Sequence, residues 1–122
     1  PAPKSPPPDA DPGYNETLLR RLNVLIEIER VHLDPELTFA GFVERMSAPE
    51  RTVRTLINRH LGFDHFRAFL NHHRVAEACR LLADTTRDDK LIAIALDSGF
   101  ASLASFNRAF RAVEGCSPSA YR

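Results

Sequence analysis

The sequence lacks most of the features that mark secreted, membrane-spanning or catalytic chains. No apolar run among the 122 residues approaches the ~20 residues that a membrane-spanning helix needs, and no signal peptide is visible. The two cysteines, Cys79 and Cys116, have no framework spacing, so we interpret them as reduced thiols of a cytoplasmic protein. No nucleophile–base pattern, carboxylate pair or phosphate-binding loop is present, which argues against an enzyme, and no cofactor is expected.

The sequence also lacks a net charge, with 16 basic and 16 acidic side chains. A neutral chain argues mildly against nucleic-acid binding, which usually recruits a basic surface. The distribution weakens that objection, because residues 1–43 carry 4 basic and 7 acidic side chains, whereas residues 44–122 carry 12 basic and 9 acidic ones. Any contact with DNA is therefore expected in the second stretch, with modest affinity.

What the sequence does contain is a helical pattern of apolar residues along most of its length. Hydrophobic residues make up 43% of the chain and charged ones 26%, which is typical of a globular protein with a core. The 3.6-residue periodicity predicts an all-α fold with about seven helices and no β-sheet. We expect a disordered proline-rich linker, an N-terminal helix, an N-terminal repeat, a long linker helix and a C-terminal repeat, over residues 1–12, 13–35, 36–63, 64–86 and 87–122.

In the N-terminal repeat, capping and turn residues predict where the helices begin and end. Thr38 is expected to cap a short helix that starts directly after it. Ser47, with Glu50 three residues later, predicts a capping box for a second helix over 50–61. Gly62 is expected to end that helix.

In the C-terminal repeat, Asp88 or Asp89 is expected to cap a short apolar helix. Ser102 is predicted to cap a second helix over 103–114, and Gly115 to close it.

This last helix separates two kinds of side chain. One side carries large apolar residues at helical spacing, namely Leu103, Phe106, Phe110 and Val113. The opposite side carries small and basic residues, namely Ala104, Arg108 and Arg111, with Asn107 on the flank. A helix with aromatic residues on its buried face and arginines between small residues on its exposed face is typical of helices that insert into a DNA major groove. A solvated amphipathic helix would show the same pattern.

The two segments 36–63 and 87–122 share one pattern of apolar and polar residues, which is why we call them repeats. A shift of 53 residues places apolar residues on apolar ones, for example Phe39 on Ile92 and Val53 on Phe106. The exposed positions correspond but differ in identity, pairing Arg51 with Ala104, Arg54 with Asn107, Thr55 with Arg108 and Asn58 with Arg111. Two copies of one scaffold that read different base edges would show this pattern, and so would a protein-interaction repeat.

The most specific motifs of the chain lie near its end, in residues 94–100 (IALDSGF), 106–111 (FNRAFR) and 115–122 (GCSPSAYR). They are similar to the stretch IALxxGFxSxxxFxRAFKxxxGxSPxxYR of AraC-type transcription regulators, and residues 36–122 as a whole resemble the DNA-binding domain of that family. Leu61-Gly62, and then Phe69-Leu70-Asn71 with Arg74, Glu77 and Ala78, resemble its linker helix. The sequence departs from the family at Ser47, where many members have a turn glycine, and at Pro49, where they have a capping serine.

The resemblance implies sequence-specific binding of double-stranded DNA by two helix-turn-helix units. Their reading helices would enter successive major grooves, which recur every ~34 Å. The residues expected at the DNA are Arg51, Arg54, Thr55, Asn58 and Arg59 in the N-terminal repeat and Ser102, Ala104, Asn107, Arg108 and Arg111 in the C-terminal repeat. Arg108 is the expected base reader, because arginine pairs bidentately with guanine, while Ser102 and Arg59 are candidate phosphate contacts.

The family further implies an upstream sensor or dimerisation domain outside this chain, and RNA polymerase as a further partner. The chain begins with Pro1 rather than Met, so we interpret it as part of a longer protein. No membrane contact is expected of these 122 residues. The alternative function is an all-helical protein-interaction module that does not bind nucleic acid.

Histidines offer one more candidate site. His65, His72, His73 and Cys79 share the expected linker helix. Metal ligands on one helix must converge, and no two of these histidines have i, i+4 spacing, so a metal site is disfavoured. His60 lies on the apolar side of its helix and is interpreted as a core or boundary residue.

Overall fold

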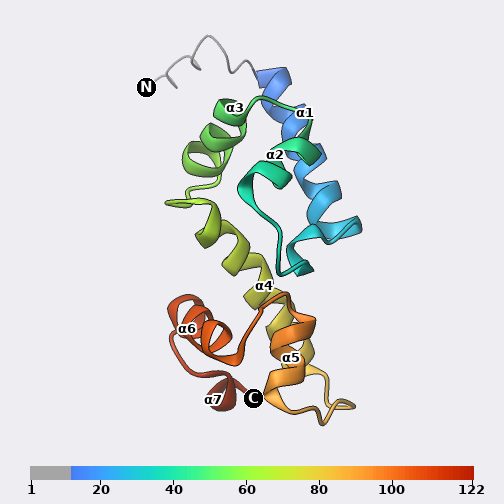
Figure 1. Ribbon diagram of the computed structural model, residues 1–122, viewed down its shortest axis with the longest axis vertical. Coiled ribbons are helices and arrows are strands. Elements are labelled where there is room, and N and C mark those ends of the chain that lie inside the picture. Colours follow the sequence, from blue (N-terminus) through green and yellow to red (C-terminus); the bar gives the residue numbers. More distant parts are fainter. Residues whose placement is uncertain (1–11) are drawn as a thin grey trace. The chain divides into compact units, whose positions relative to one another are not determined.

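The computed structural model describes residues 12–122, and that range is helical with no strand (Figure 1). The predicted all-α fold with about seven helices is confirmed, since seven α-helices lie in the described range. The linker predicted for residues 1–12 lies, except for Pro12, outside the described residues. The chain forms two compact units, which we call unit 1 (residues up to Arg30, and Leu37–Phe66) and unit 2 (Val31–Glu36 and Arg67–Arg122).

Unit 1 contains three α-helices. Helix α1 (Pro12–Asn23) continues into a short π-helix, η1 (Val24–Ile28), and is followed by α2 (Phe39–Met46) and α3 (Glu50–Thr55). Helix α3 continues into a second π-helical turn, η3 (Leu56–His60). The most buried apolar side chains of this unit come from η1, α2, α3 and η3 and are Leu25, Phe42, Met46, Val53, Leu56 and Ile57.

The turn between α2 and α3 confirms one predicted cap and corrects another. Thr38 caps α2 as expected, because its Oγ1 accepts a hydrogen bond of 3.0 Å from the Gly41 N–H. Ser47 does not form the predicted capping box. It ends α2 with a left-handed backbone at φ 55°, so its side chain cannot reach the start of α3. Pro49 occupies the N-cap position of α3, and no side chain caps that helix.

The end of this helix also differs from the prediction in one respect. Gly62 follows η3 with φ +79°, a backbone conformation that glycine adopts without strain. His60, interpreted from the sequence as a core or boundary residue, is exposed. The helical wheel placed it near the apolar side, but it lies in the last turn, beyond the buried residues Leu56 and Ile57.

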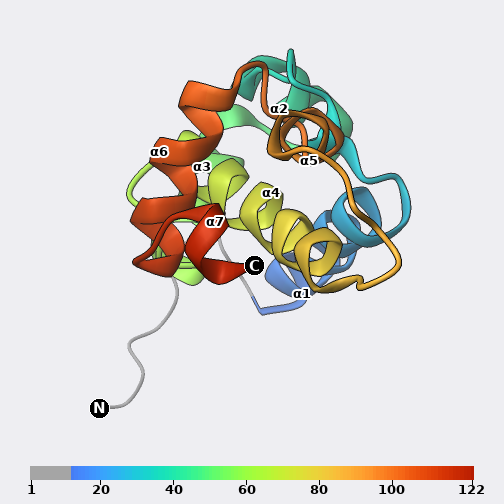
Figure 2. The ribbon, with the colours of Figure 1, turned by 90° about the horizontal axis from the view of Figure 1, so that it is seen from below.

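Unit 2 is built on the long helix α4 (Phe66–Ala83), whose residues from Arg67 onward belong to it. Helices α5 (Leu91–Asp97), α6 (Leu103–Glu114) and α7 (Pro118–Tyr121) lie around its C-terminal part (Figure 2). One core cluster joins α4, α5 and α6 and consists of Val75, Ala78, Leu81, Leu82, Ile94, Ala95, Phe100, Phe106, Ala109 and Phe110. This cluster holds α6 from behind.

The caps of unit 2 were predicted correctly at α6 and wrongly at α5. Ser102 caps α6 by accepting a 3.1 Å hydrogen bond from the Ser105 N–H, and Gly115 closes it at φ +81°. Helix α5 has Lys90 at its N-cap and no side-chain cap. The carboxylate of Asp89 is instead paired with Arg87, whose Nη2 also lies 2.9 Å from an Asp97 carboxylate oxygen.

The turn between α5 and α6 packs closely against the short segment Val31–Glu36. Gly99 has φ +95°, and a Cβ added there would lie 2.5 Å from the His32 carbonyl oxygen and 2.9 Å from the Leu33 Cα. The buried Arg74 guanidinium holds the same segment, because Nε donates to the His32 carbonyl (2.7 Å) and Nη2 to the Asp34 carbonyl (2.9 Å). Residues 31–36 are therefore an integral part of unit 2.

Three histidines meet near this segment. The ring of His73 on α4 lies 5.1 Å from that of His72 and 5.9 Å from that of His32, centroid to centroid, and it packs edge-on against Phe69. Burial of the ring, with the neighbouring His72 and His32, lowers the pKa of His73 to about 4. Within residues 12–122, no group of three or more His, Cys, Asp or Glu side chains is placed to hold a metal ion.

We expect Gly99→Ala to destabilise the protein more than Gly62→Ala. Both positions have positive φ, so alanine costs about 1–2 kcal/mol of backbone strain at either one. Only at position 99 does the new methyl group also collide with backbone atoms, since no atom lies within 4 Å of a Cβ at position 62. Urea unfolding of both variants measures the difference, and equal losses would contradict the packing described for Gly99.

Unfolding free energy should fall as the pH drops from about 6.5 to about 4. The unfolded chain binds a proton at His73 near its ordinary pKa of 6.5, whereas the folded protein binds it only near 4, so protonation favours unfolding. A full shift of this size is worth about 3 kcal/mol, and partial exposure of the ring reduces our expectation to about 1–2 kcal/mol. His73→Gln should flatten this part of the pH profile in urea titrations. Exposed His60→Gln is the control and should leave it unchanged.

Candidate nucleic-acid interface

The exposed face of α6 presents two arginines that the rest of the described chain leaves unengaged. Arg108 and Arg111 are exposed, and the guanidinium of neither forms a hydrogen bond or ion pair with any other described residue. Ala104 is exposed beside them, and Asn107 on the flank is half-buried. The four predicted residues of this helix therefore lie together on or beside one face, with two positive charges and a small side chain.

Aromatic contacts hold the opposite face of α6. Phe106 and Phe110 are fully buried, and their rings form a series with Phe100 and Tyr121 at centroid distances of 5.3, 5.7 and 5.4 Å. The predicted apolar stripe is wrong at its two ends, since Leu103 is 37% exposed and Val113 39% exposed. The core cluster contacts α6 only around its middle, where Ala109 completes the buried face.

The N-terminus of α6 uses its serine internally. The Ser102 Oγ accepts from the Ser105 N–H and donates to the Ser105 Oγ at 3.0 Å. The Ser105 Oγ in turn donates to the Ser102 carbonyl oxygen at 3.1 Å. Ser102 thus fixes the start of the helix, and a phosphate contact from its hydroxyl would replace the bond to Ser105.

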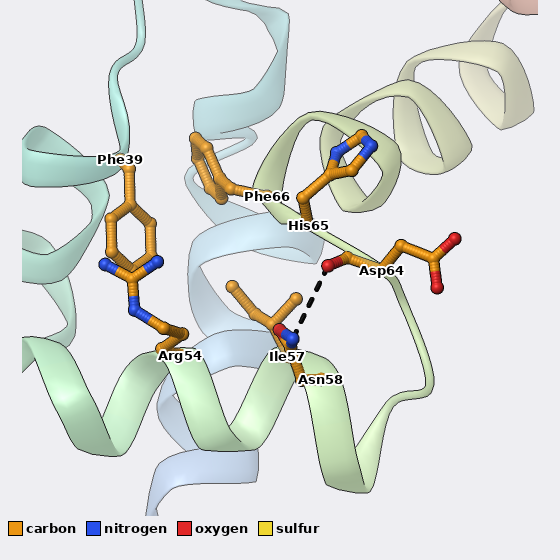
Figure 3. A pocket seen from close by; sticks show the side chains of 7 residues that line it. All are labelled: Phe39, Arg54, Ile57, Asn58, Asp64, His65 and Phe66. Atoms are coloured by element: carbon orange, nitrogen blue, oxygen red, sulfur yellow. Dashed lines mark hydrogen bonds between the residues drawn. The ribbon is translucent and has the colours of Figure 1, made fainter.

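On α3 and η3, the residues predicted to contact DNA are less exposed or more engaged by other residues than those on α6. Arg51 and Arg59 are exposed, and Thr55 is half-buried. The side-chain amide of Asn58 is also exposed, and it donates a long hydrogen bond of 3.4 Å to the Asp64 carbonyl oxygen (Figure 3). The guanidinium of Arg59 makes no hydrogen bond or ion pair with other residues in the described part of the chain.

Arg54 is occupied by two neighbours. Its guanidinium lies over the Phe39 ring, 4.8 Å from the centroid (Figure 3). It also pairs with the Glu50 carboxylate, one turn earlier on α3. The i, i+4 spacing of Glu50 and Arg54 could have indicated the ion pair from the sequence. The contact with Phe39 crosses from α3 to α2, so no local pattern could have indicated it.

A small hollow lies between Arg54 and the start of α4. It has a volume of about 70 Å³ and is lined by Phe39, Arg54, Ile57, Asn58, Asp64, His65 and Phe66 (Figure 3). Ligand pockets are usually about 300–1,000 Å³, so this hollow is too small for a cofactor or an effector. None of the helices in residues 12–122 has both the length and the hydrophobicity to cross a bilayer.

Comparisons with known proteins agree with this geometry. A family model described as a helix-turn-helix domain matches residues 42–122, and no curated protein matches the chain significantly. A solved Listeria innocua protein of unknown function is 27% identical, with a TM-score of 0.65 over 82% of this chain and 91% of that chain.

Two further solved structures share the fold. The C-terminal domain of AraT, a response regulator from Geobacillus stearothermophilus, is 24% identical, with a TM-score of 0.71 over 87% of this chain and 83% of its own. The C-terminal domain of the two-component response regulator yesN from Fusobacterium nucleatum is 22% identical, with a TM-score of 0.69 over 85% and 98%. Because the family model covers more than half of the sequence, this chain belongs to the AraC-type helix-turn-helix family of DNA-binding domains.

Proposed function

We propose that the chain is the sequence-specific DNA-binding domain of a transcription regulator and that α6 is its principal reading helix. The exposed face of α6 carries this proposal, because Arg108 and Arg111 project from a helix whose other face is locked by buried aromatics. Arginine on a major-groove helix can donate two hydrogen bonds to guanine O6 and N7, and a small residue such as Ala104 can contact a thymine methyl group.

The helix formed by α3 and η3 is the proposed counterpart in unit 1. The resemblance to the family supports a second insertion, one helical turn further along the duplex. The 18 residues of α4 span ~27 Å, which is of the same order as the ~34 Å between successive major grooves. Arg51, Thr55 and Asn58 would face this second groove, and Arg59 and Ser102 would contact phosphates.

Other parts of the regulator are inferred from the relatives. Two of the solved neighbours are C-terminal domains of response regulators. We therefore propose that an upstream sensor or dimerisation domain controls this domain, and that RNA polymerase is the partner it influences. Action on chromosomal DNA would place it in the cytoplasm. The family consists of regulatory DNA-binding domains and is not an enzyme family.

Arg108→Ala should weaken binding to a selected DNA site by about 1–3 kcal/mol, the size of one bidentate base contact. Because Arg108 is exposed and opposite the buried face, the variant should fold normally. The loss should concentrate at one base pair, so that changing this pair no longer affects the mutant. Titrations against the site and its single-base variants measure this, and an equal loss on every variant would make Arg108 a backbone contact.

Arg59→Ala should instead weaken binding to all sequences alike. As a phosphate contact, Arg59 would contribute about one unit to the slope of log affinity against log salt concentration, and the variant should lose that unit. Arg20→Ala on α1 removes the same charge from an exposed site and is the matched control. A wild-type chain with no salt-dependent affinity for duplex DNA would favour a protein-interaction module.

A further inference from the structure

We infer that the two units contribute unequally to sequence recognition: α6 reads bases, whereas Arg54 on α3 is a positioning residue that does not. This inference rests on the proposed function. It assigns base reading by arginine to the exposed face of α6 and gives Arg54 of unit 1 no base to read.

The internal repeat identifies the difference between the two reading faces. Thr55 of unit 1 stands where unit 2 has Arg108, and Asn58 stands where unit 2 has Arg111. Both unengaged cations of α6 therefore have uncharged counterparts in unit 1, one on α3 and one on η3. A threonine or asparagine makes fewer and weaker charge-assisted contacts than the fork of arginine, so positions 55 and 58 bind a guanine edge more weakly than Arg108 and Arg111 can.

Arg54 cannot easily replace the missing arginine at position 55. On the helical wheel it lies on the flank, about 100° from Thr55, because successive residues turn by that angle. Its guanidinium is placed over Phe39 and against the Glu50 carboxylate. To reach a base, it would have to leave both partners and expose the Glu50 charge to the DNA phosphates.

The contacts of Arg54 lead inward to the core of unit 1. The Phe39 ring that it covers packs against Phe66 at a centroid distance of 5.3 Å, and Phe66 packs against the buried Phe42 at the same distance. Arg54 thus closes a stack that joins α3 to the N-terminus of α2. The angle between the two helices of this helix-turn-helix depends in part on that closure.

Unit 2 has no equivalent of this clamp. The counterparts of Phe39 and Arg54 are Ile92, which is 40% exposed, and Asn107. An aliphatic side chain has no aromatic face for a cation, and asparagine carries no charge. In unit 2 the helix is held instead by Phe106 and Phe110, so its arginines remain available.

The experiment begins with a duplex selected from random sequences by the wild-type chain. Affinities are then measured for every single-base variant of that site, with wild-type protein, Arg108→Ala, Arg54→Ala, Phe39→Leu and the Arg54→Ala/Phe39→Leu double variant. The base pair whose identity ceases to matter to Arg108→Ala marks the half-site beneath α6. Under the proposed function, positions one helical turn away, about 10 base pairs, are those expected to face α3.

A positioning role predicts that Arg54→Ala lowers the affinity for all DNA variants by one common factor, about 2- to 5-fold. Phe39→Leu removes the ring face and keeps apolar bulk, so it should produce the same uniform loss. The double variant should lose no more than the larger single effect, because both changes remove one contact. Arg108→Ala should instead lose about 5- to 150-fold, at one base pair.

Arg54→Lys keeps the test valid if alanine at this position unfolds unit 1. Lysine retains a cation for Phe39 and for Glu50 but lacks the planar fork that binds guanine bidentately. A positioning residue should tolerate this change with affinity and base preferences close to wild type. A base reader should lose its preference at one base pair beneath α3.

Two results would overturn the inference, and they are distinguishable. If Arg54→Ala or Arg54→Lys abolishes discrimination at one base pair that Phe39→Leu leaves intact, Arg54 reads a base, and the proposed function stands without the inference. If the wild-type chain binds no duplex or shows no base preference, the proposed function fails and the inference fails with it.

Discussion

The burial of Phe106 and Phe110 behind α6 is the contact on which the exposed arginine face of that helix depends. Phe106 and Phe110 are fully buried and fix the rotation of the helix about its axis, since turning it would expose both rings. That rotation determines where Arg108 and Arg111 point. The stability of unit 2 and the direction in which its two exposed arginines point are therefore consequences of the same packing.

Capping and turn residues in the sequence correctly predicted helix ends that depend only on contacts with nearby residues. Ser102 and Gly115 bound α6 as expected, because a cap needs only a hydroxyl or a flexible backbone within a few residues. The N-caps predicted at Ser47 and Asp89 were wrong, because each residue has a different role in the fold. Ser47 adopts a left-handed backbone to end α2, and Asp89 pairs with Arg87. The faces of α6 followed from periodicity, but the exposure of Val113 depends on how far the neighbouring core extends.

The sequence could not show which arginine side chains are bound by other residues and which are left exposed without a partner. Arg54 and Arg108 both occur on amphipathic helices, and only their surroundings separate them. The partner of Arg54 in the fold, Phe39, lies fifteen positions earlier on another helix. The same holds for Arg74. In the structure it is buried and donates to the carbonyls of His32 and Asp34, but nothing in the sequence distinguishes it from an exposed arginine of the same helix.

The contacts of Arg74 also mean that the two units are interleaved along the chain. Residues 31–36 belong to unit 2, yet they precede the helices α2 and α3 of unit 1. Each unit is therefore assembled from two separate stretches, and no single cut of the chain releases either one whole. A fragment that starts after Glu36 would leave Arg74 without the carbonyls it binds and Gly99 without the backbone it packs against. Chain connectivity thus makes completion of unit 2 depend on a segment that is synthesised before helices α2 and α3 of unit 1.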